Sequence, residues 1–159
     1  MKIKRIVVLG LSLFGLMAGV AVATPGLFAT ASTPVRGTIA EPFKVKVKGV
    51  IDLKTKDPID VADQTITLQA GGHTGWHSHP GPVLVVIKSG TLTVYRADDP
   101  SCTPAVYPAG SSFVDPGGGN VHIARNEGTT PVELLATYLL PIGAGPRTDV
   151  VQAPGNCAF

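Results

Sequence analysis

The sequence is poor in the groups on which the familiar hydrolases depend. Among 159 residues there are two cysteines, four histidines and one tryptophan, and aromatic residues make up only 6%. There is no Ser-His-Asp order, no phosphate-cradling glycine loop and no C-x-x-C pair. A hydrolase with an activated nucleophile is therefore unsupported.

Charge is also scarce, since Asp, Glu, Lys and Arg together make up 15% of the chain. Three of the 13 basic residues, Lys2, Lys4 and Arg5, precede residue 24. Without them, ten basic residues face eleven acidic ones, which is a formal net charge of −1. Nothing in this balance supports binding of nucleic acid or of a membrane surface by the remaining domain.

Residues 1–23 have the pattern of a secretory signal peptide. A basic start precedes an apolar run over residues 6–22, and Ala21-Val22-Ala23 is a cleavage pattern. No cysteine follows the run, so lipoprotein attachment is not expected. Two alternatives stay open: the run just reaches the lower length for a retained anchor, or Ala29-Thr30-Ala31 moves the cut. We expect cleavage and an exported protein, periplasmic or secreted.

The rest of the chain is the size of one domain and favours short strands and turns, because it is rich in Gly, Pro, Val and Thr. Residues 24–40 show no period and are predicted to be a flexible leader. Residues 42–50 alternate between apolar residues and lysines, which predicts a half-buried strand. We expect a polar loop over residues 52–63, and another strand over residues 64–70 with Ile66 and Leu68 facing inward.

The segment from Val83 to Ile87 is apolar on both faces, which suits a strand in the middle of a sandwich. Ser89-Gly90 predicts a hairpin turn into a strand over residues 91–96. Several further short strands before residue 140 indicate an all-β sandwich or barrel. We assign the barrel to residues 41–145 and a C-terminal tail to residues 146–159.

Cys102 and Cys157 are more consistent with a disulfide than with catalysis in an exported protein. A bridge between them would tie the C-terminal tail and close a loop of about 55 residues, worth roughly 4 kcal/mol in the chain-entropy model. Two free thiols are the alternative.

The histidines are the chemically informative residues. His77 and His79 are two apart, so an extended chain would direct both imidazoles to one side, as two ligands of one metal require. His73 would lie about 13 Å from His77 along a regular strand, too far to share a metal with it. Trp76 alternates to the opposite side. A lone H-x-H is weak evidence, and its surroundings decide its meaning.

Those surroundings form two motifs. Gly71 is followed by five residues and then the pair His77 and His79, with Gly90 eleven positions further on. A second segment contains Gly110, the stretch 116–118 with Pro and Gly, and then His122 and Asn126. This arrangement resembles the cupin family, over roughly residues 65–140. The resemblance implies a jelly-roll β-barrel in which His77, His79 and His122 bind a metal, with an asparagine that is structural.

The sequence departs from the cupin pattern at two places. The family's glutamate ligand should fall at Val83 or Leu84, and both are apolar. The loop 117–120 is one residue longer than the family pattern. Some cupins bind iron through three histidines, the cysteine-dioxygenase-like ones among them, and others have lost their metal. The resemblance therefore implies a set of at most three histidines.

Three neutral imidazoles would leave a divalent transition metal its full positive charge and open positions for water, dioxygen or substrate. The metal could be Fe, Mn, Zn, Cu or Ni, and an anionic or bidentate substrate is favoured. Two functions are consistent with this: a metal-dependent oxygenase or isomerase acting on a small molecule, or a non-catalytic cupin that binds or senses a small ligand. The expected pocket neighbours are His73, Trp76, Val83 and Tyr138.

No catalytic residue is identified. The expected partner is a small-molecule ligand or substrate, with no nucleic acid and no membrane after signal cleavage, and a homodimer stays open.

Overall fold

The structure, a computed structural model, describes residues 25–159 and contains strands and turns but no helix in that range. The predicted signal peptide lies outside the described residues, within which no helix is long and apolar enough to cross a membrane. The strands in chain order are β1 (Leu27–Ala31), β2 (Val35–Ile39), β3 (Lys44–Val47), β4 (Ile51–Lys54), β5 (Ile59–His73), β6 (His77–Ser78), β7 (Val83–Ser89), β8 (Thr91–Arg96), β9 (Ala105–Pro108), β10 (Ser112–Asp115), β11 (His122–Arg125), β12 (Val132–Pro141) and β13 (Thr148–Asp149).

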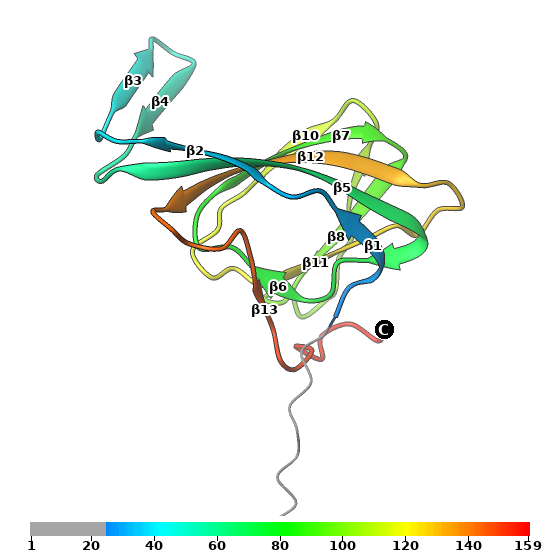
Figure 1. Ribbon diagram of the computed structural model, residues 1–159. Helices are drawn as coiled ribbons and strands as arrows, with labels where there is room; N and C mark the ends of the chain where they lie inside the picture. The colour runs from blue at the N-terminus through cyan, green and yellow to red at the C-terminus, as the bar shows by residue number, and fades with distance from the viewer. Residues whose placement is uncertain (1–24) are drawn as a thin grey trace, which may run out of the picture.

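The strands form a nearly closed barrel with two walls (Figure 1). One wall has the order β10, β7, β12, β5, with β1 and β2 also paired to β5. The other contains β9, β8, β11, β6 and β13. The walls join where Arg125 of β11 pairs with His73 of β5. The all-β prediction is confirmed, and the connectivity is consistent with a jelly roll.

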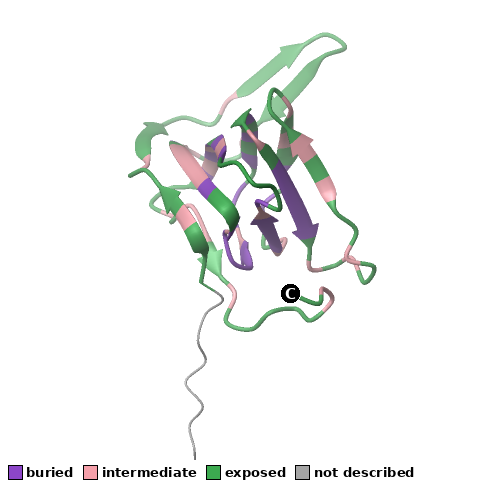
Figure 2. Cartoon of the chain, turned by 90° about the vertical axis from the view of Figure 1, so that its right-hand side faces the viewer, coloured by how far each residue is buried: buried purple, intermediate pink, exposed green. Residues whose placement is uncertain are grey.

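Buried residues concentrate on the strands of the barrel, whereas the projecting hairpin and the C-terminal tail are mostly exposed (Figure 2). Val83, Val85 and Ile87 point inward and are 7% exposed or less, together with Leu68 of β5. A second, smaller core contains Trp76, Tyr95 and Ile123 and lies under the C-terminal residues. The protein therefore has a large hydrophobic core inside the barrel and a smaller one beneath the C-terminal tail.

The prediction of a flexible leader is wrong for residues 27–39. β1 and β2 both pair antiparallel with the long strand β5. Arg36 of β2 donates a hydrogen bond of 2.8 Å to the buried carboxylate of Asp60. Most of these residues are exposed and small or polar, so their order comes from backbone pairing, which leaves no hydrophobic period in the sequence.

The strand predicted over residues 42–50 is present as β3, but the prediction that it is half-buried is wrong, because all of β3 is exposed. The predicted loop over residues 52–63 is also wrong, because β4 and the start of β5 lie in this range. β3 and β4 form a two-stranded hairpin that projects from the barrel (Figure 1). Val45 pairs with Leu53, and both are exposed, at 48% and 41%. The alternation gives the apolar face of this hairpin correctly. It contains no information on whether another element covers that face.

Ser89-Gly90 does not close a hairpin, because β7 pairs with β10 and β12 whereas β8 pairs with β9 and β11. Gly90 has a φ of +75°, and a Cβ there would lie 2.7 Å from the Pro131 carbonyl oxygen. The turn therefore takes the chain from one wall of the barrel to the other. Ser89-Gly90 alone predicts a turn, but it does not determine whether the two strands that the turn joins pair with each other.

The predicted disulfide between Cys102 and Cys157 is present. The tail that the disulfide ties also contains β13, in which Thr148 pairs with Ser78 and Asp149 pairs with His77 of β6. The side-chain amide of Asn156 donates to the backbone carbonyls of Arg96 and Asp99. The tail therefore lies against the histidine end of the barrel.

Candidate metal centre

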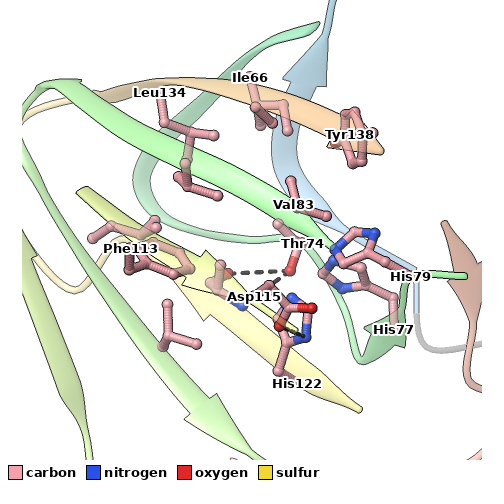
Figure 3. A pocket seen from close by; sticks show the side chains of 15 residues that line it. Ile66, Thr74, His77, His79, Val83, Phe113, Asp115, His122, Leu134 and Tyr138 are labelled. Carbon is pink, nitrogen blue, oxygen red and sulfur yellow. Dashed lines mark hydrogen bonds and ion pairs between the residues drawn. The ribbon is translucent and has the colours of Figure 1, made fainter. Parts of the chain in front are cut away.

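The fold brings the three motif histidines together. His77 lies on β6 and pairs directly with His122 at the start of β11. The ring centroids are 4.4 to 5.1 Å apart, and the candidate ligand atoms of His77, His79 and His122 all lie within 4.8 Å of one another. All three residues are buried, at 7% exposed or less. Figure 3 shows their rings gathered at one end of a cavity.

Two glycine-rich loops produce this convergence. Gly117 has a φ of +65°, and a Cβ there would lie 2.1 Å from the carbonyl oxygen of Gly81. Only glycine permits this backbone contact. The amide of Gly119 donates a hydrogen bond to the His79 carbonyl, which adds to the contact between the loops. The loop before His122 is thereby packed on the loop after His79.

Each histidine has its Nδ1 atom against an oxygen. The Nδ1 of His77 lies 2.9 Å from the carbonyl oxygen of Gly75, and that of His79 lies 2.7 Å from the carbonyl oxygen of Pro146. The Nδ1 of His122 lies 3.2 Å from an Asp115 carboxylate oxygen. A carbonyl can only accept, so Nδ1 carries the proton and Nε2 keeps its lone pair. Metal-ligating histidines characteristically have such a partner on the second ring nitrogen.

The electrostatic environment keeps these rings neutral. Burial, with a smaller contribution from the neighbouring His122, lowers the pKa of His77 to about 2. Burial also lowers the pKa of His122 to about 4, although the Asp115 carboxylate acts in the opposite direction. The pKa of His79 is lowered by the same desolvation. Neutral imidazole is the form that binds a metal, so the three residues fit a divalent transition metal.

The position of the family's glutamate is occupied by Val83, which is 2% exposed and lines the cavity, whereas Leu84 points outward. Asp115 on β10 pairs directly with Val83. Its carboxylate does not face the three Nε2 atoms, because one oxygen accepts from the Gly117 amide and the other lies against His122. The carboxylate therefore supports a histidine and does not replace the missing ligand.

Two cavities lie beside the histidines. The inner one, of about 50 Å³, lies inside the barrel among aliphatic side chains and Phe113. The outer one, of about 400 Å³, opens between β1 and the tail, and Gln64, Arg147 and Asp149 are part of its lining. His77, His79 and Tyr138 line both. A ligand in the outer cavity would therefore lie against His77 and His79.

Arg147 provides a positive charge at this entrance. Its guanidinium donates to the Thr74 carbonyl at 3.0 Å and to the Asp149 carboxylate. The charge is close enough to lower the pKa values of His77, His79 and Tyr138. No hydrogen bond of its Nη1 atom occurs among the described residues, which leaves two N–H groups for a ligand.

Of the other residues predicted to lie near the pocket, Tyr138 lines both cavities, whereas His73 and Trp76 line neither. The Tyr138 ring is 5.5 Å from that of His79, its hydroxyl donates to Gln64, and burial raises its pKa to about 12. His73 lines neither cavity; its Nδ1 accepts from the amide of Gly75, the residue that orients His77. Trp76 does not line the pocket, because the alternation along the chain directs it into the small core under the tail.

Sequence reasoning missed two residues of the site. Asp115 directly precedes the Pro116-Gly117-Gly118 stretch, and this position next to the motif is a usable signal. Arg147 lies in the tail, where no motif indicates a role. Asn126 is structural, since its side chain bonds the Leu68 and Thr130 carbonyls and the Gly128 amide.

Comparisons with known proteins agree with this geometry. A family model described as a cupin domain matches residues 64–138, which contain both motifs and all three histidines. No curated protein sequence matches the chain. The matched segment therefore contains the three histidines that the fold brings together.

Solved structures with a similar fold include a cupin superfamily protein from Desulfitobacterium hafniense, at 12% identity and a TM-score of 0.45, covering 69% of this chain and 79% of that one. A conserved protein of unknown function from Streptococcus pyogenes has 17% identity and a TM-score of 0.44, with 69% and 75% covered. Oxalate decarboxylase from Bacillus subtilis, studied for its Mn(II) centres, has 21% identity and a TM-score of 0.49, with 57% and 24% covered. The domain match and its two converging motifs establish that this chain belongs to the cupin superfamily.

Proposed function

We propose that His77, His79 and His122 hold one divalent transition metal and that the protein is a metal-dependent enzyme acting on a small anionic molecule. The observation that carries the proposal is the proximity of three buried imidazoles, each with an oxygen against Nδ1 and none with a hydrogen bond on Nε2 among the described residues. Histidines kept only for packing would not need the same tautomer three times.

When bound, the metal would supply Lewis acidity and a site for dioxygen or substrate. The residues of the chain supply the surroundings. The apolar inner cavity, with Val83 and Phe113 in its wall, excludes water behind the histidines. Tyr138 holds its phenolic proton at neutral pH, and burial raises its pKa to about 12, further above that range. The outer cavity of about 400 Å³ falls in the usual range of ligand pockets.

The charge at the site supports an anionic substrate. The three ligands are neutral and Val83 stands where the family has a carboxylate, so a bound metal would keep its full charge. Arg147 adds a second cation at the entrance, where its Nε and Nη2 atoms donate to Asp149 and Thr74, and the N–H groups of its Nη1 atom can donate to a carboxylate oxygen of a ligand. A small carboxylate or dicarboxylate fits both features.

The cavity lining favours dioxygen chemistry over isomerisation. Apart from the histidines, its ionisable residues are Asp115, Tyr138, Arg147 and Asp149. Each is already engaged: Asp115 by His122, Tyr138 by Gln64, and Arg147 by Asp149. An isomerase needs a proton acceptor beside the substrate, and no unengaged carboxylate lines the cavities in the described chain. The absence of an unengaged carboxylate from these linings also favours a second function, that of a cupin that binds an anion without turning it over.

Titration of the metal-loaded protein with a series of small mono- and dicarboxylates tests the substrate class. We expect Arg147→Gln to raise their Kd about tenfold with metal content unchanged, and Arg147→Lys to recover part of the affinity, because Lys retains the charge without the planar fork. Dioxygen uptake with a bound carboxylate would support the enzyme, and tight binding without uptake the second function. Full metal content with no carboxylate affinity would contradict the substrate class.

The proposal includes export. Its support is the signal-like sequence of residues 1–23 together with the disulfide between Cys102 and Cys157, which suits an oxidising compartment. The intact mass of the protein taken from its native cells should lack the first 23 residues. A full-length, reduced protein in the cytoplasm would contradict export.

A further inference from the structure

The outer face of the wall formed by β10, β7, β12 and β5 carries an aliphatic cluster that no described residue covers. Leu84, Val86, Val114 and Leu135 are 44%, 46%, 63% and 46% exposed. Val114 pairs with Leu84, and Leu135 pairs with Val86, so the four side chains are cross-strand neighbours on one face. We call these four residues the outer aliphatic patch.

The sequence of β7 is the strongest indication that the patch is normally covered. Strands that are apolar on both faces are typical of positions between two layers. Of the apolar residues of β7, the barrel interior buries Val83, Val85 and Ile87, which leaves Leu84 and Val86 on the outer face with no described residue over them. An aliphatic patch of this kind marks an interaction surface when it is contiguous, as it is here.

The same face contains a shallow hollow beside the patch. It has a volume of about 400 Å³ and lies over β5 and β2, where Val35, Thr65 and Thr137 are part of its lining. Leu135 belongs to both features. The face therefore presents a raised aliphatic cluster on one side and a hollow on the other.

The charges beside the patch have both signs. Lys88 of β7 and Glu133 of β12 lie at one end and form an ion pair of 2.6 Å. Asp63 of β5 accepts a hydrogen bond from Thr137 at the other end. Such a mixture gives no attraction for nucleic acid or for an anionic lipid surface. An apolar centre with a rim of both signs is the composition of a protein–protein interface.

We infer that this face is the contact surface between two copies of the chain, related by a two-fold axis that runs along the strands between β7 and β12. This axis exchanges the positions of β7 and β12, so Val86 of each copy lies over Leu135 of the other. It also places Val114 over the hollow, and Lys88 opposite Glu133 of the second copy. The face is thus complementary to itself, as a two-fold interface requires, and the two walls stack as sheets do in a sandwich.

The inference is independent of the metal site. The patch lies on the outside of β7 and β12, whereas the histidines and the cavity lie inside. Variants in the patch can therefore be made without changing a residue that lines the cavity.

Sedimentation velocity of the full chain over a range of concentrations tests the surface. We expect a dimer for the wild type and a Kd raised at least about a hundredfold by Val86→Glu, because a charge would be buried without a partner. Val106→Glu is the matched control: Val106 is 57% exposed on β9 of the opposite wall, and its change should leave the dimer intact. If circular dichroism shows that Val86→Glu is misfolded, Val86→Ser replaces it, with about a tenfold increase expected.

A wild type that stays monomeric at the highest concentration overturns the inference. So does a dimer that Val86→Glu and Val86→Ser leave unchanged, since the contact would then lie elsewhere, for example on the exposed hairpin of β3 and β4.

Charge reversal tests the direction of the axis. Lys88→Glu and Glu133→Lys alone should each weaken the dimer about tenfold, through like charges across the interface. An equimolar mixture of the two variants should restore it, because each contact between copies then joins opposite charges. Loss of the ion pair within one chain cannot produce this recovery, so a mixture as weak as its components overturns the proposed axis.

Discussion

The histidine site has a barrel side, formed by His77 and His122, and a tail side, where the C-terminal tail contacts His79. The two sides are held in different ways. His77 and His122 pair with each other on β6 and β11, and their Nδ1 atoms are bound by residues of the two motifs and the barrel. His79 is oriented by the carbonyl of Pro146, 67 residues further along the chain. The barrel side is built by the pattern that identifies the family. The tail side lies outside the matched residues 64–138 and is held in place by β13 and the disulfide.

This difference means that the barrel side should determine whether a metal binds, and the tail side how well it binds and what reaches it. Pro146 orients one ligand, and Arg147 next to it provides the positive charge at the entrance. Evolution or design could therefore change the ligand preference of the site by altering the tail, while the strands that carry the motifs stay the same.

The largest effect is expected from His122→Ala, which removes a ligand from the barrel side. Metal content after desalting should fall to background, as measured by inductively coupled plasma mass spectrometry, because two imidazoles remain from a set of three. His73→Ala is the control, since His73 lies outside the candidate cluster and should leave the metal bound. Equal metal content in the two variants would show that the metal is bound elsewhere.

A smaller loss is expected from Asp115→Asn. The carboxylate lies 3.2 Å from Nδ1 of His122, and removal of such a partner costs about 10- to 100-fold in metal affinity. Competition with a chromophoric chelator measures this affinity. Asp99→Asn is a control, because Asp99 bonds the Ser101 and Thr103 amides in a distant exposed loop. An unchanged affinity in Asp115→Asn would mean that the barrel side does not depend on this carboxylate.

The sequence predicted the barrel side well and the tail side poorly, for a physical reason. Side-chain alternation and glycine spacing identified His77, His79 and His122, because these signals are local or belong to a known motif. The motif also predicted an apolar wall at Val83 or Leu84, and the structure shows that Val83 is the buried one of the two. In contrast, Arg147 and the Pro146 carbonyl work through contacts between distant segments, and a backbone carbonyl leaves no trace in a sequence. The disulfide prediction was the one clue that the tail is held near the barrel.

Acid should affect the barrel histidines in the metal-free protein. The folded-state pKa values of His77 and His122 are about 2 and about 4, below the ordinary 6.5, so the unfolded chain binds more protons as the pH falls. Stability is then complete above about pH 6.5 and declines toward pH 4.5, by up to about 1.4 kcal/mol per pH unit for each histidine. Urea unfolding across this range measures the slope, and His77→Gln should reduce it. A flat profile would contradict neutral buried rings.

Removal of the disulfide should have the smallest effect on the metal and a clear effect on stability. The double variant Cys102→Ser, Cys157→Ser is expected to lose about 2–4 kcal/mol of unfolding free energy, because the cross-link no longer restricts the unfolded chain. Metal affinity should fall only several-fold, through a looser Pro146 carbonyl beside His79. A complete loss of metal in this folded variant would show that the tail, and not the barrel, determines binding.

The most direct test of the account is the metal content of the wild-type protein. After exposure to Fe²⁺, Mn²⁺, Zn²⁺, Cu²⁺ or Ni²⁺ and removal of free ions, we expect about one equivalent of a divalent transition metal per chain, bound through three imidazoles. The same treatment of His77→Ala should leave none. A correctly folded wild-type protein that retains none of these ions would contradict the central claim.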